Sequence, residues 1–366
     1  MNVLHFCSYY VGSKVYFELF KAISNVYSQQ AYIPVRSEEH LLSKQVPGVD
    51  FYFVKKLNAL TRICYLYKLI SVVFPALKNY LENNVTDFVH AHTLYSDGIP
   101  AYLFSRVRNQ KLVVTVRNTD VNLGFKYYRH YKWLVRKVLV YSSKIIFISP
   151  AHKKQFQNYF GHTYDGKLFV IPNGVDEFFI DNSKHSKSKE GGGVVALHIA
   201  AIDKNKNLKN TILAYFMAIK EHEKAEFRVA GGTYSDYKKV FGDLPEHLKG
   251  KVVFLGKLDK EQLIKHMSES SIFIMVSHKE TFGLVYVEAI SQCLPIVYTS
   301  GQGVDGYFSD GVYGFKANSR SVESISTAIQ NTLNKFPNGL GPFEENPAAS
   351  FSWDKIAKVY MEEVYK

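Results

Sequence analysis

The sequence HKETFGLVYVEA, residues 278–289, places two glutamates eight residues apart around a Phe-Gly pair. The apolar run Ser271–Val276 comes before it and predicts a buried strand. We expect a turn over residues 277–282 and then a helix with Glu288 in its early turns, because Gly283 permits a close backbone approach. The free amides at such a helix start suit a diphosphate, since a helix N-terminus carries about half a positive charge. This stretch therefore predicts a strand–loop–helix unit that binds a ligand.

The same alternation of strand and helix patterns runs along the whole chain, and its 366 residues favour two domains. Apolar runs that predict strands cover residues 3–7, 51–54, 87–91, 112–116, 145–148, 169–171, 194–200, 225–229, 252–255, 271–276 and 295–298. Strands that alternate with helices predict parallel sheets covered by helices on both faces. We therefore expect an α/β protein with two doubly wound, Rossmann-like domains facing a central cleft.

The domain boundaries follow from a composition change near the middle of the chain. The polar segment Asp181–Gly193 ends in three consecutive glycines and predicts a link between domains. We place the first domain at residues 1–175, the linker at 176–193 and the second domain at 194–345. Residues 346–366 have apolar positions at helical spacing and no strand after them. They predict a helix that packs back onto the first domain.

Composition excludes several classes of protein. Lys and Arg total 45 against 33 Asp and Glu, a net charge of +12, and three cysteines support neither a disulfide framework nor a cysteine zinc site. The charge is compatible with nucleic acid, anionic lipid or a phosphorylated substrate and does not choose among them. The apolar region Leu60–Leu77 is interrupted by Arg62, Lys68 and Pro75, so we expect no spanning helix. With no signal-peptide pattern at its start, the chain is expected in the cytoplasm.

The two glutamates of the first motif are candidates for sugar recognition. Glu280 lies in the expected loop and Glu288 on the expected helix. Carboxylates suit polyols because each offers two oxygens to paired hydroxyls. Their spacing is equally compatible with two solvated acids near a helix start.

The block Glu280–Glu288 resembles the two-glutamate motif of retaining glycosyltransferases with the GT-B fold, specifically glycosyltransferase family 4, the glycosyl transferases of group 1. The resemblance extends to VIPNGVD at 170–176, DFVHAH at 87–92 and FSW at 351–353, and so covers nearly the whole chain. It implies transfer of a sugar from a nucleotide-diphosphate donor to an acceptor hydroxyl with retention at the anomeric carbon. It also implies that no metal and no resident cofactor take part.

The resemblance assigns roles residue by residue. Glu280 would bind the donor sugar, Glu288 the ribose, and Lys206 the diphosphate, a role that suits the compact charge of a lysine. The residues expected to be catalytic are Glu280, Lys206 and His92. Those expected to bind the donor are Glu288, Phe282, Gly283, Leu284, Gly12 and Lys204.

Two positions depart from the family pattern. Ala201 stands where the family usually has an arginine, and Lys204 is a candidate substitute. Arg117 stands where the family often has a histidine; it stays protonated and cannot act as a base, but its fork can bind phosphate or a hydroxyl. We expect Arg117, Asn118 and Asp120 on the acceptor side.

The pair His90 and His92 lies two residues apart on an expected strand, hence on one face of it. A metal pair would fit this spacing, but no third ligand follows at a usual distance along the sequence. We therefore expect no metal, and we place His92 beside the acceptor or the donor sugar.

Two basic aromatic stretches, residues 60–80 and 125–133, suit a membrane interface or a lipid-linked acceptor. An ordinary amphipathic helix gives the same pattern. The expected partners are a nucleotide-sugar donor, a glycan or lipid-linked acceptor and an anionic membrane surface, with no nucleic acid. The expected role is cell-surface polysaccharide or glycolipid synthesis, with peripheral attachment to the inner face of a membrane. The alternatives are a non-catalytic nucleotide-sugar or glycan binding protein, or a nucleotide-sugar epimerase of the same fold.

Overall fold

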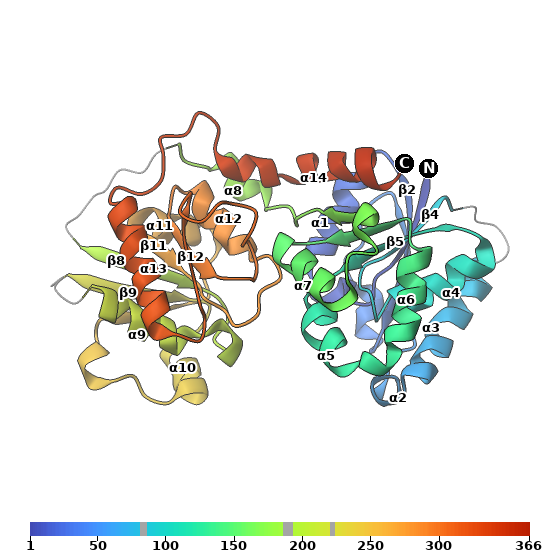
Figure 1. Ribbon diagram of the computed structural model, residues 1–366, viewed down its shortest axis with the longest axis horizontal. Coiled ribbons are helices and arrows are strands. Elements are labelled where there is room, and N and C mark those ends of the chain that lie inside the picture. Colours follow the sequence, from blue (N-terminus) through green and yellow to red (C-terminus); the bar gives the residue numbers. More distant parts are fainter. Residues whose placement is uncertain (81–85, 186–192, 220–223) are drawn as a thin grey trace. The chain divides into compact units, whose positions relative to one another are not determined.

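The computed structural model describes residues 1–80, 86–185, 193–219 and 224–366. The chain divides into two compact units (Figure 1). The N-terminal unit comprises Met1–Ile148, His152–Gly174 and Trp353–Lys366, and the C-terminal unit comprises Ser149–Ala151 and Val175–Ser352. Within the segment expected as a linker, Glu177–Asp181 form helix α8, and residues 186–192 lie outside the described residues.

The N-terminal unit is built on a seven-stranded parallel sheet with the order β3-β2-β1-β4-β5-β6-β7. Its strands are β1 Asn2–Phe6, β2 Ser28–Val35, β3 Val49–Lys55, β4 Phe88–Ala91, β5 Lys111–Val116, β6 Lys144–Phe147 and β7 Leu168–Val170. Its helices are α1 Lys14–Ile23, α2 Ala59–Ile63, α3 Tyr65–Tyr80, α4 Gly98–Arg108, α5 Phe125–Tyr127, α6 Lys132–Tyr141, α7 Pro150–Phe160 and α14 Trp353–Val359. The strand order moves outward from β1 in both directions, as in a doubly wound fold.

The C-terminal unit repeats this architecture on a six-stranded parallel sheet with the order β10-β9-β8-β11-β12-β13. Its strands are β8 Val194–Ile199, β9 Ala225–Ala230, β10 Val252–Gly256, β11 Ile272–Ile274, β12 Ile296–Thr299 and β13 Gly314–Ala317. Besides α8, its helices are α9 Leu208–Ala218, α10 Tyr234–Phe241, α11 Lys260–Glu269, α12 Leu284–Ser291 and α13 Val322–Lys335. The expected pair of Rossmann-like sheets is confirmed.

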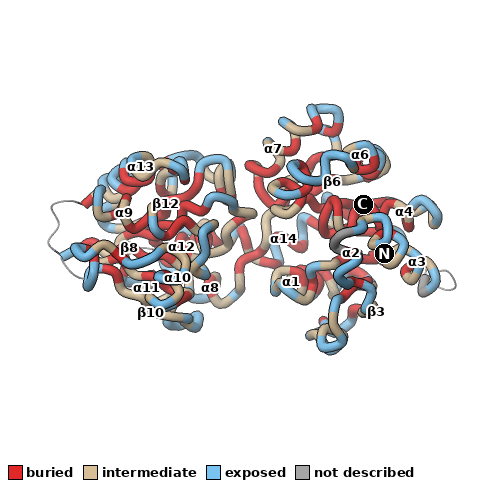
Figure 2. The backbone as a smooth tube through the Cα atoms, turned by 90° about the horizontal axis from the view of Figure 1, so that it is seen from below, coloured by how far each residue is buried: buried red, intermediate tan, exposed pale blue. Residues whose placement is uncertain are grey.

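Alternate residues of the strands feed opposite faces of the first sheet. On β1, Leu4 and Phe6 join one apolar cluster, while Val3 joins the cluster on the other face. This alternation follows from the two-residue period of a strand and explains why both faces need helical cover. Figure 2 shows the buried residues gathered inside each unit and exposed residues along outer helices such as α3 and α13.

Two strands, β2 and β13, escaped the sequence analysis. The sequence of β2, SQQAYIPV, begins with polar residues and contains a proline, both of which argue against a central strand. Its Gln29 is nevertheless buried, because its amide donates to the Phe20 carbonyl over 2.9 Å and its oxygen contacts the His5 ring over 3.1 Å. Satisfied hydrogen bonds thus let a polar residue occupy the core.

The C-terminal segment belongs to the N-terminal unit. Figure 1 shows α14 beside α1, although the two helices lie at opposite ends of the sequence. Ile356, Tyr360 and Val364 are buried in the same apolar cluster as α1. At the start of α14 the Trp353 ring lies so close to Gly174 that an added Cβ would approach it to 2.4 Å. Two of the stretches that carry the family resemblance, PNG and FSW, therefore meet in space.

No helix in the described ranges combines the length and apolar character needed to cross a bilayer.

Candidate active site

The centre of the C-terminal unit's site is an ion pair. Lys206 lies in the loop after β8 and Glu280 in the loop after β11, and these strands are neighbours in the sheet. The Lys206 Nζ atom lies 2.7 Å from Glu280 Oε2, with side-chain exposures of only 22% and 12%. Because the carboxyl ends of parallel strands share one edge, residues 74 positions apart in sequence meet there. The structure brings together the two residues expected to be catalytic in this unit.

Further hydrogen bonds join the same two loops. The Asn205 side chain donates to the Lys279 carbonyl over 2.9 Å and accepts from the Lys279 amide over 3.1 Å. The His278 amide donates to the Asn205 carbonyl over 2.8 Å. Asp203 accepts from the Lys206 amide over 2.9 Å, which closes the turn that carries the lysine. Sequence reasoning missed this positioning role of Asn205, because an Asn in a Lys/Asn loop carries no distinguishing local signal.

Two glycines shape the loop around Glu280. Gly283 immediately precedes α12 with a φ of +79°, and an added Cβ would lie 2.4 Å from the Tyr286 ring. Gly303 has a φ of +57°, and its amide donates to the Glu280 carbonyl over 3.2 Å. Only glycine combines a positive φ with the lack of a side chain that these two positions require. At the start of α12 the Tyr286 amide donates to the Gly283 carbonyl over 3.0 Å. The amides of Leu284 and Val285 precede the first intrahelical acceptor and are available to a negative group.

The remaining donor-side residues differ in accessibility. Phe282 is buried, with its ring against Tyr307 and Phe351, so only its backbone faces the loop. Lys204 and Ala201 are exposed on the loop after β8. The position of Lys204 is compatible with a replacement for the missing arginine, at the outer side of the turn that holds Lys206.

Glu288 lies on the second turn of α12 in a largely buried setting. Burial, reinforced by the nearby Asp176 carboxylate, raises its pKa to about 7, and the Lys260 ammonium acts in the opposite sense. Lys260 is paired with Asp176 over 2.5 Å. Near neutral pH, Glu288 is therefore divided between its neutral and charged forms, and its neutral form can both donate and accept hydrogen bonds to a diol.

The N-terminal unit holds a pocket of about 650 Å³ at the carboxyl ends of its strands. Its lining includes Ser8 after β1, Arg36 after β2, Tyr95 and Ser96 after β4, and Thr119 after β5. Open α/β sheets bind ligands at this edge. Gly12 and Asp120 also line this pocket, so Gly12, expected on the donor side, lies among the acceptor-side candidates.

Asp120 organises the pocket wall from within. Its buried carboxylate accepts from the amides of Leu94 (2.9 Å), Tyr95 (3.0 Å) and Arg117 (2.9 Å). Burial raises its pKa to about 6, against the lowering effect of these three bonds. Because both oxygens are engaged, Asp120 acts as a positioning residue rather than a free acid.

Arg117 is held in place by its own contacts. Its guanidinium lies 4.5 Å from the centre of the Tyr16 ring, donates to the His92 carbonyl over 3.2 Å, and reaches Asn173 over 3.4 Å. Asn118 is a hydrogen-bond partner of Asn122. Arg117 remains positively charged at any working pH, so a proton-accepting role at this position has no support.

His92 does not reach a surface. Its ring is fully buried, and its Nε2 lies 3.0 Å from His5 Nδ1. His90 completes a group of three imidazoles, with Thr115 and Tyr365 as hydrogen-bond partners. Burial lowers the pKa of all three rings, which keeps them neutral. The expected place of His92 beside the acceptor or the donor sugar is therefore not supported, because its ring is fully buried and does not line the pocket. Sequence spacing missed His5, because it comes from another strand.

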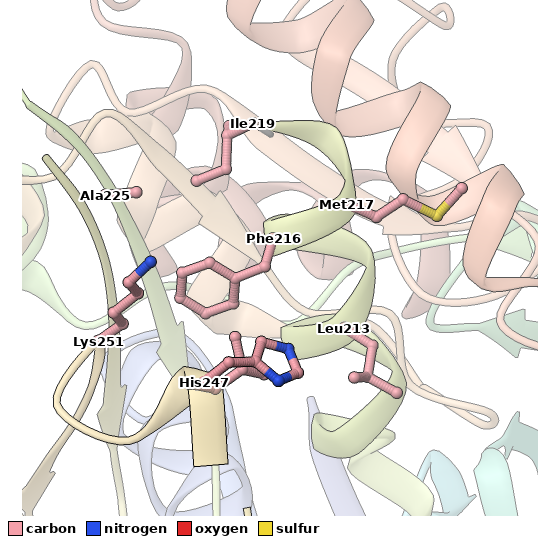
Figure 3. Close-up of a pocket in the computed structure, with 8 residues that line it drawn as sticks. Leu213, Phe216, Met217, Ile219, Ala225, His247 and Lys251 are labelled. Atoms are coloured by element: carbon pink, nitrogen blue, oxygen red, sulfur yellow. The ribbon is translucent and has the colours of Figure 1, made fainter. Parts of the chain in front are cut away.

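A second hollow, of about 350 Å³, lies at the opposite edge of the C-terminal sheet (Figure 3). Leu213, Phe216 and Met217 line it from α9, while Ala225 and Lys251 come from the amino ends of strands. This hollow lies at the amino edge of the sheet, whereas the Lys206–Glu280 pair lies at the carboxyl edge, so the two are separate sites.

Comparison with known proteins places this architecture in a class. The model "Glycosyl transferases group 1" matches residues 179–337, and the model "Glycosyltransferase Family 4" matches residues 40–177. Similar proteins include an uncharacterised glycosyltransferase of Methanocaldococcus jannaschii, 24% identical over 78% of either chain. They also include alpha-monoglucosyldiacylglycerol synthase of Streptococcus pneumoniae, 24% identical over 74% of this chain and 62% of that enzyme.

Solved structures share the fold over the full length. The Anabaena protein HepE in complex with UDP and glucose has a TM-score of 0.66 at 18% identity, covering 99% of this chain and 98% of that one. Sucrose-phosphate synthase from Thermosynechococcus elongatus has a TM-score of 0.75 at 16% identity, covering 100% and 98%. The fold is thus that of the GT-B glycosyltransferases. The models of the glycosyl transferases group 1 and of Glycosyltransferase Family 4 match its C-terminal and N-terminal parts, so the chain resembles these glycosyltransferases over most of its length.

The raised pKa of Glu288 predicts a pH-dependent stability. Between its ordinary value of 4.5 and about 7, the unfolded state holds fewer protons on this group than the folded state. Stability should therefore fall as pH rises through this window and then level off, and Glu288→Gln should remove that component. Thermal unfolding of the protein and the variant at several pH values measures the difference. Parallel curves for the two proteins would show that Glu288 titrates normally.

Proposed function

We propose that this chain is a retaining glycosyltransferase that uses a nucleotide-diphosphate sugar, held by the C-terminal unit, to glycosylate a hydroxyl of a glycan or lipid-linked acceptor held by the N-terminal unit. The part-buried Lys206–Glu280 pair beside the Gly283 helix start carries the proposal. Relatives support the chemistry: one bears the name of a glycolipid synthase, and HepE was solved with UDP and glucose.

The ion pair suits a donor that carries both hydroxyls and a diphosphate. The Lys206 ammonium has three N–H groups and gives one to Glu280, which leaves two for phosphate oxygens. Glu280 Oε1 accepts only the Thr281 amide, over 3.2 Å, in the described structure, and retains lone pairs for sugar hydroxyls. One residue can therefore hold the sugar while the other holds the leaving group.

The proposed reaction is a front-side displacement. The bond between the anomeric carbon and the diphosphate oxygen breaks, and the acceptor oxygen bonds to the same face of that carbon. The acceptor proton passes to the departing diphosphate, so no side chain must act as the base. Lys206 and the amides at the start of α12 would stabilise the charge that develops on the leaving group.

The first test concerns the pair itself. Lys206→Met and Glu280→Gln should each reduce transfer about 100- to 1000-fold, because loss of one charge-stabilising group at a reacting centre costs that much. The measurement is turnover with the donor and acceptor identified by screening. Lys209→Met, an exposed lysine of α9, is the control and should retain full activity.

Folding and stereochemistry must be separated from catalysis. Because loss of one partner leaves the other charge buried, the double variant Lys206→Met with Glu280→Gln should unfold more like the parent than either single variant does. NMR of the product should show the anomeric configuration of the donor. An inverted product, or parental activity in both single variants, would overturn the proposal. Binding of donor without any transfer would favour the non-catalytic alternative.

We further propose that the reaction needs no divalent metal. Lys206 and the helix amides already supply positive charge at the expected diphosphate site. Activity should therefore be unchanged in EDTA. Loss of activity in EDTA that Mg²⁺ or Mn²⁺ restores would contradict a metal-free reaction.

An anionic membrane is the proposed location of the acceptor, and the N-terminal unit offers a surface for it. Helix α3 exposes Leu66, Ile70 and Phe74 to 61%, 64% and 73%. The sequence from Lys55 to Leu81 contains no acidic residue. The ring of Tyr65, at the start of α3, lies 4.6 Å from that of Tyr131, so the second basic aromatic stretch adjoins the first.

In the second stretch, residues 125–133, not every basic side chain is exposed to a lipid surface. Lys126, Arg129 and Trp133 are exposed, and the Lys137 ammonium lies over the Trp133 ring. Lys132 is turned inward: its ammonium donates to the Tyr159 carbonyl over 3.0 Å and lies 4.0 Å from the centre of the Tyr159 ring. Lys137 therefore replaces Lys132 among the residues that we expect at a lipid surface.

Vesicle co-sedimentation tests this surface. Serine at Lys126, Arg129 and Lys137 should weaken binding to phosphatidylglycerol-containing vesicles about 100-fold, since each cation contributes about 1 kcal/mol. Serine at Leu66, Ile70 and Phe74 should weaken binding also at high salt, where screening removes the charge effect. Serine at the exposed Lys209, Lys239 and Lys265 of the C-terminal unit is the control. Equal binding by the three variants would remove the membrane from the proposal.

A further inference from the structure

The pocket of the N-terminal unit contains a lysine that the expected mechanism does not use. Lys68 comes from α3 and lines the pocket together with Ser96, whose hydroxyl accepts a hydrogen bond from its ammonium. Among the described residues, no carboxylate oxygen lies within 4.0 Å of its Nζ atom. Burial lowers the pKa of Lys68, so the ammonium is deprived of water without gaining a direct ionic partner.

The two nearest acids are committed elsewhere. Asp97 and Asp120 both favour the charged form of Lys68 from a distance. However, Asp97 accepts from the Ser8 amide and the Thr93 hydroxyl, each over 3.0 Å, and the Asp120 oxygens accept three backbone amides. These bonds tie both carboxylates to the neighbouring loops. At least two N–H groups of Lys68 are thus left for a ligand.

A second cation, Arg36, lies at the same pocket. Arg36, exposed on the loop after β2, lies close enough to lower the pKa of Lys68 through like-charge repulsion. His40 and His130 also line the pocket. Like charges side by side are unfavourable without a ligand, and a bound anion would relieve both the repulsion and the desolvation of Lys68.

Another part of the lining is aromatic. The Tyr95 and Tyr128 rings lie 5.8 Å apart, and Tyr65 and Tyr131 continue the same wall. Gly124 makes room for this wall, because an added Cβ would lie 2.5 Å from the Tyr95 ring. Apolar ring faces beside a few placed polar groups are the usual composition of a small-molecule site. The pocket therefore combines a flat surface for a sugar ring with a cationic end.

We propose that this pocket binds an acceptor bearing a phosphate group, with Lys68 as the direct contact of the phosphate and Arg36 as a second contact at the rim. The proposal rests on the proposed function, since it takes the glycosyl acceptor as the occupant, and it specifies the chemical class of that acceptor. A lysine provides a compact charge for phosphate oxygens, and the tyrosine wall takes the attached sugar or polyol. A soluble sugar phosphate and a lipid phosphate share this chemistry.

Calorimetric titration with matched probes tests the phosphate requirement. The soluble pair is glucose 6-phosphate against glucose, and the lipid pair is dihexanoyl phosphatidic acid against dihexanoylglycerol, used below their aggregation concentrations. At least one phosphorylated probe should bind, and its unphosphorylated partner should bind about 10- to 100-fold more weakly, as expected for loss of a charge-assisted bond. The arm that responds identifies the source of the phosphate.

Variants assign the effect to Lys68. Lys68→Met should weaken the phosphorylated probe about 10- to 100-fold and leave the unphosphorylated probe unchanged, while Lys68→Arg should restore much of the loss. Lys78→Met is the matched control, because Lys78 is exposed on the same helix outside the pocket. Circular dichroism and thermal unfolding, measured in parallel, check that each variant retains the parent's fold.

The outcomes separate this proposal from the proposed function. If neither phosphate pair shows a difference, or if Lys68→Met binds as the parent does, then Lys68 serves as a counter-ion for Asp97 and Asp120 and the acceptor proposal fails. Sugar transfer that proceeds in that case would leave the proposed function intact. Phosphate binding at Lys68 without any transfer would instead support the pocket and refute the enzyme.

Discussion

The parallel arrangement of β8 and β11 is the constraint on which the site depends. Parallel neighbours end at the same edge, so the loops that follow them are forced together and the Lys206–Glu280 pair closes between them. A pair exposed by only 22% and 12% has lost most of its water, and removal of one partner would leave a costly buried charge. The same pair therefore orders two loops and keeps two complementary groups ready for a donor.

Buried polar groups in the N-terminal unit also need hydrogen-bond partners, but most of their partners are structural rather than ligand-binding groups. The Asp120 carboxylate accepts hydrogen bonds from three backbone amides and so fixes the position of a pocket wall. The imidazoles of His5 and His90 each use both ring nitrogens for hydrogen bonds, whereas the Nδ1 atom of His92 has no partner in the described structure. Burial keeps all three rings neutral. Lys68 differs from all of these, because its ammonium is largely desolvated while its only described hydrogen bond is to a hydroxyl. Lys68 therefore combines unused hydrogen-bonding capacity with a place in the pocket lining, whereas the three imidazoles do not line the pocket.

Much of the fold was predictable because its signals are local. Buried parallel strands are short apolar runs, and most of the expected ranges agree with the observed strands to within one or two residues at each end, as for 112–116 against Lys111–Val116. The strand Ser28–Val35 was missed because its polarity is compensated only by partners distant in sequence: Gln29 needs His5 and Phe20. Local pattern cannot register a hydrogen bond to a residue on another strand.

The sequence by itself determined the alternating α/β plan, the family resemblance, and the strand–loop–helix unit around Glu280 and Gly283, since each is written in contiguous residues. Only the tertiary structure decided which charges meet and which remain accessible. It joined Lys206 to Glu280, turned Lys132 inward, buried His92 and left Lys68 facing a pocket. The physical reason is that the energy of a charge depends on the water and the partners around it, and these are supplied by segments far apart in the chain.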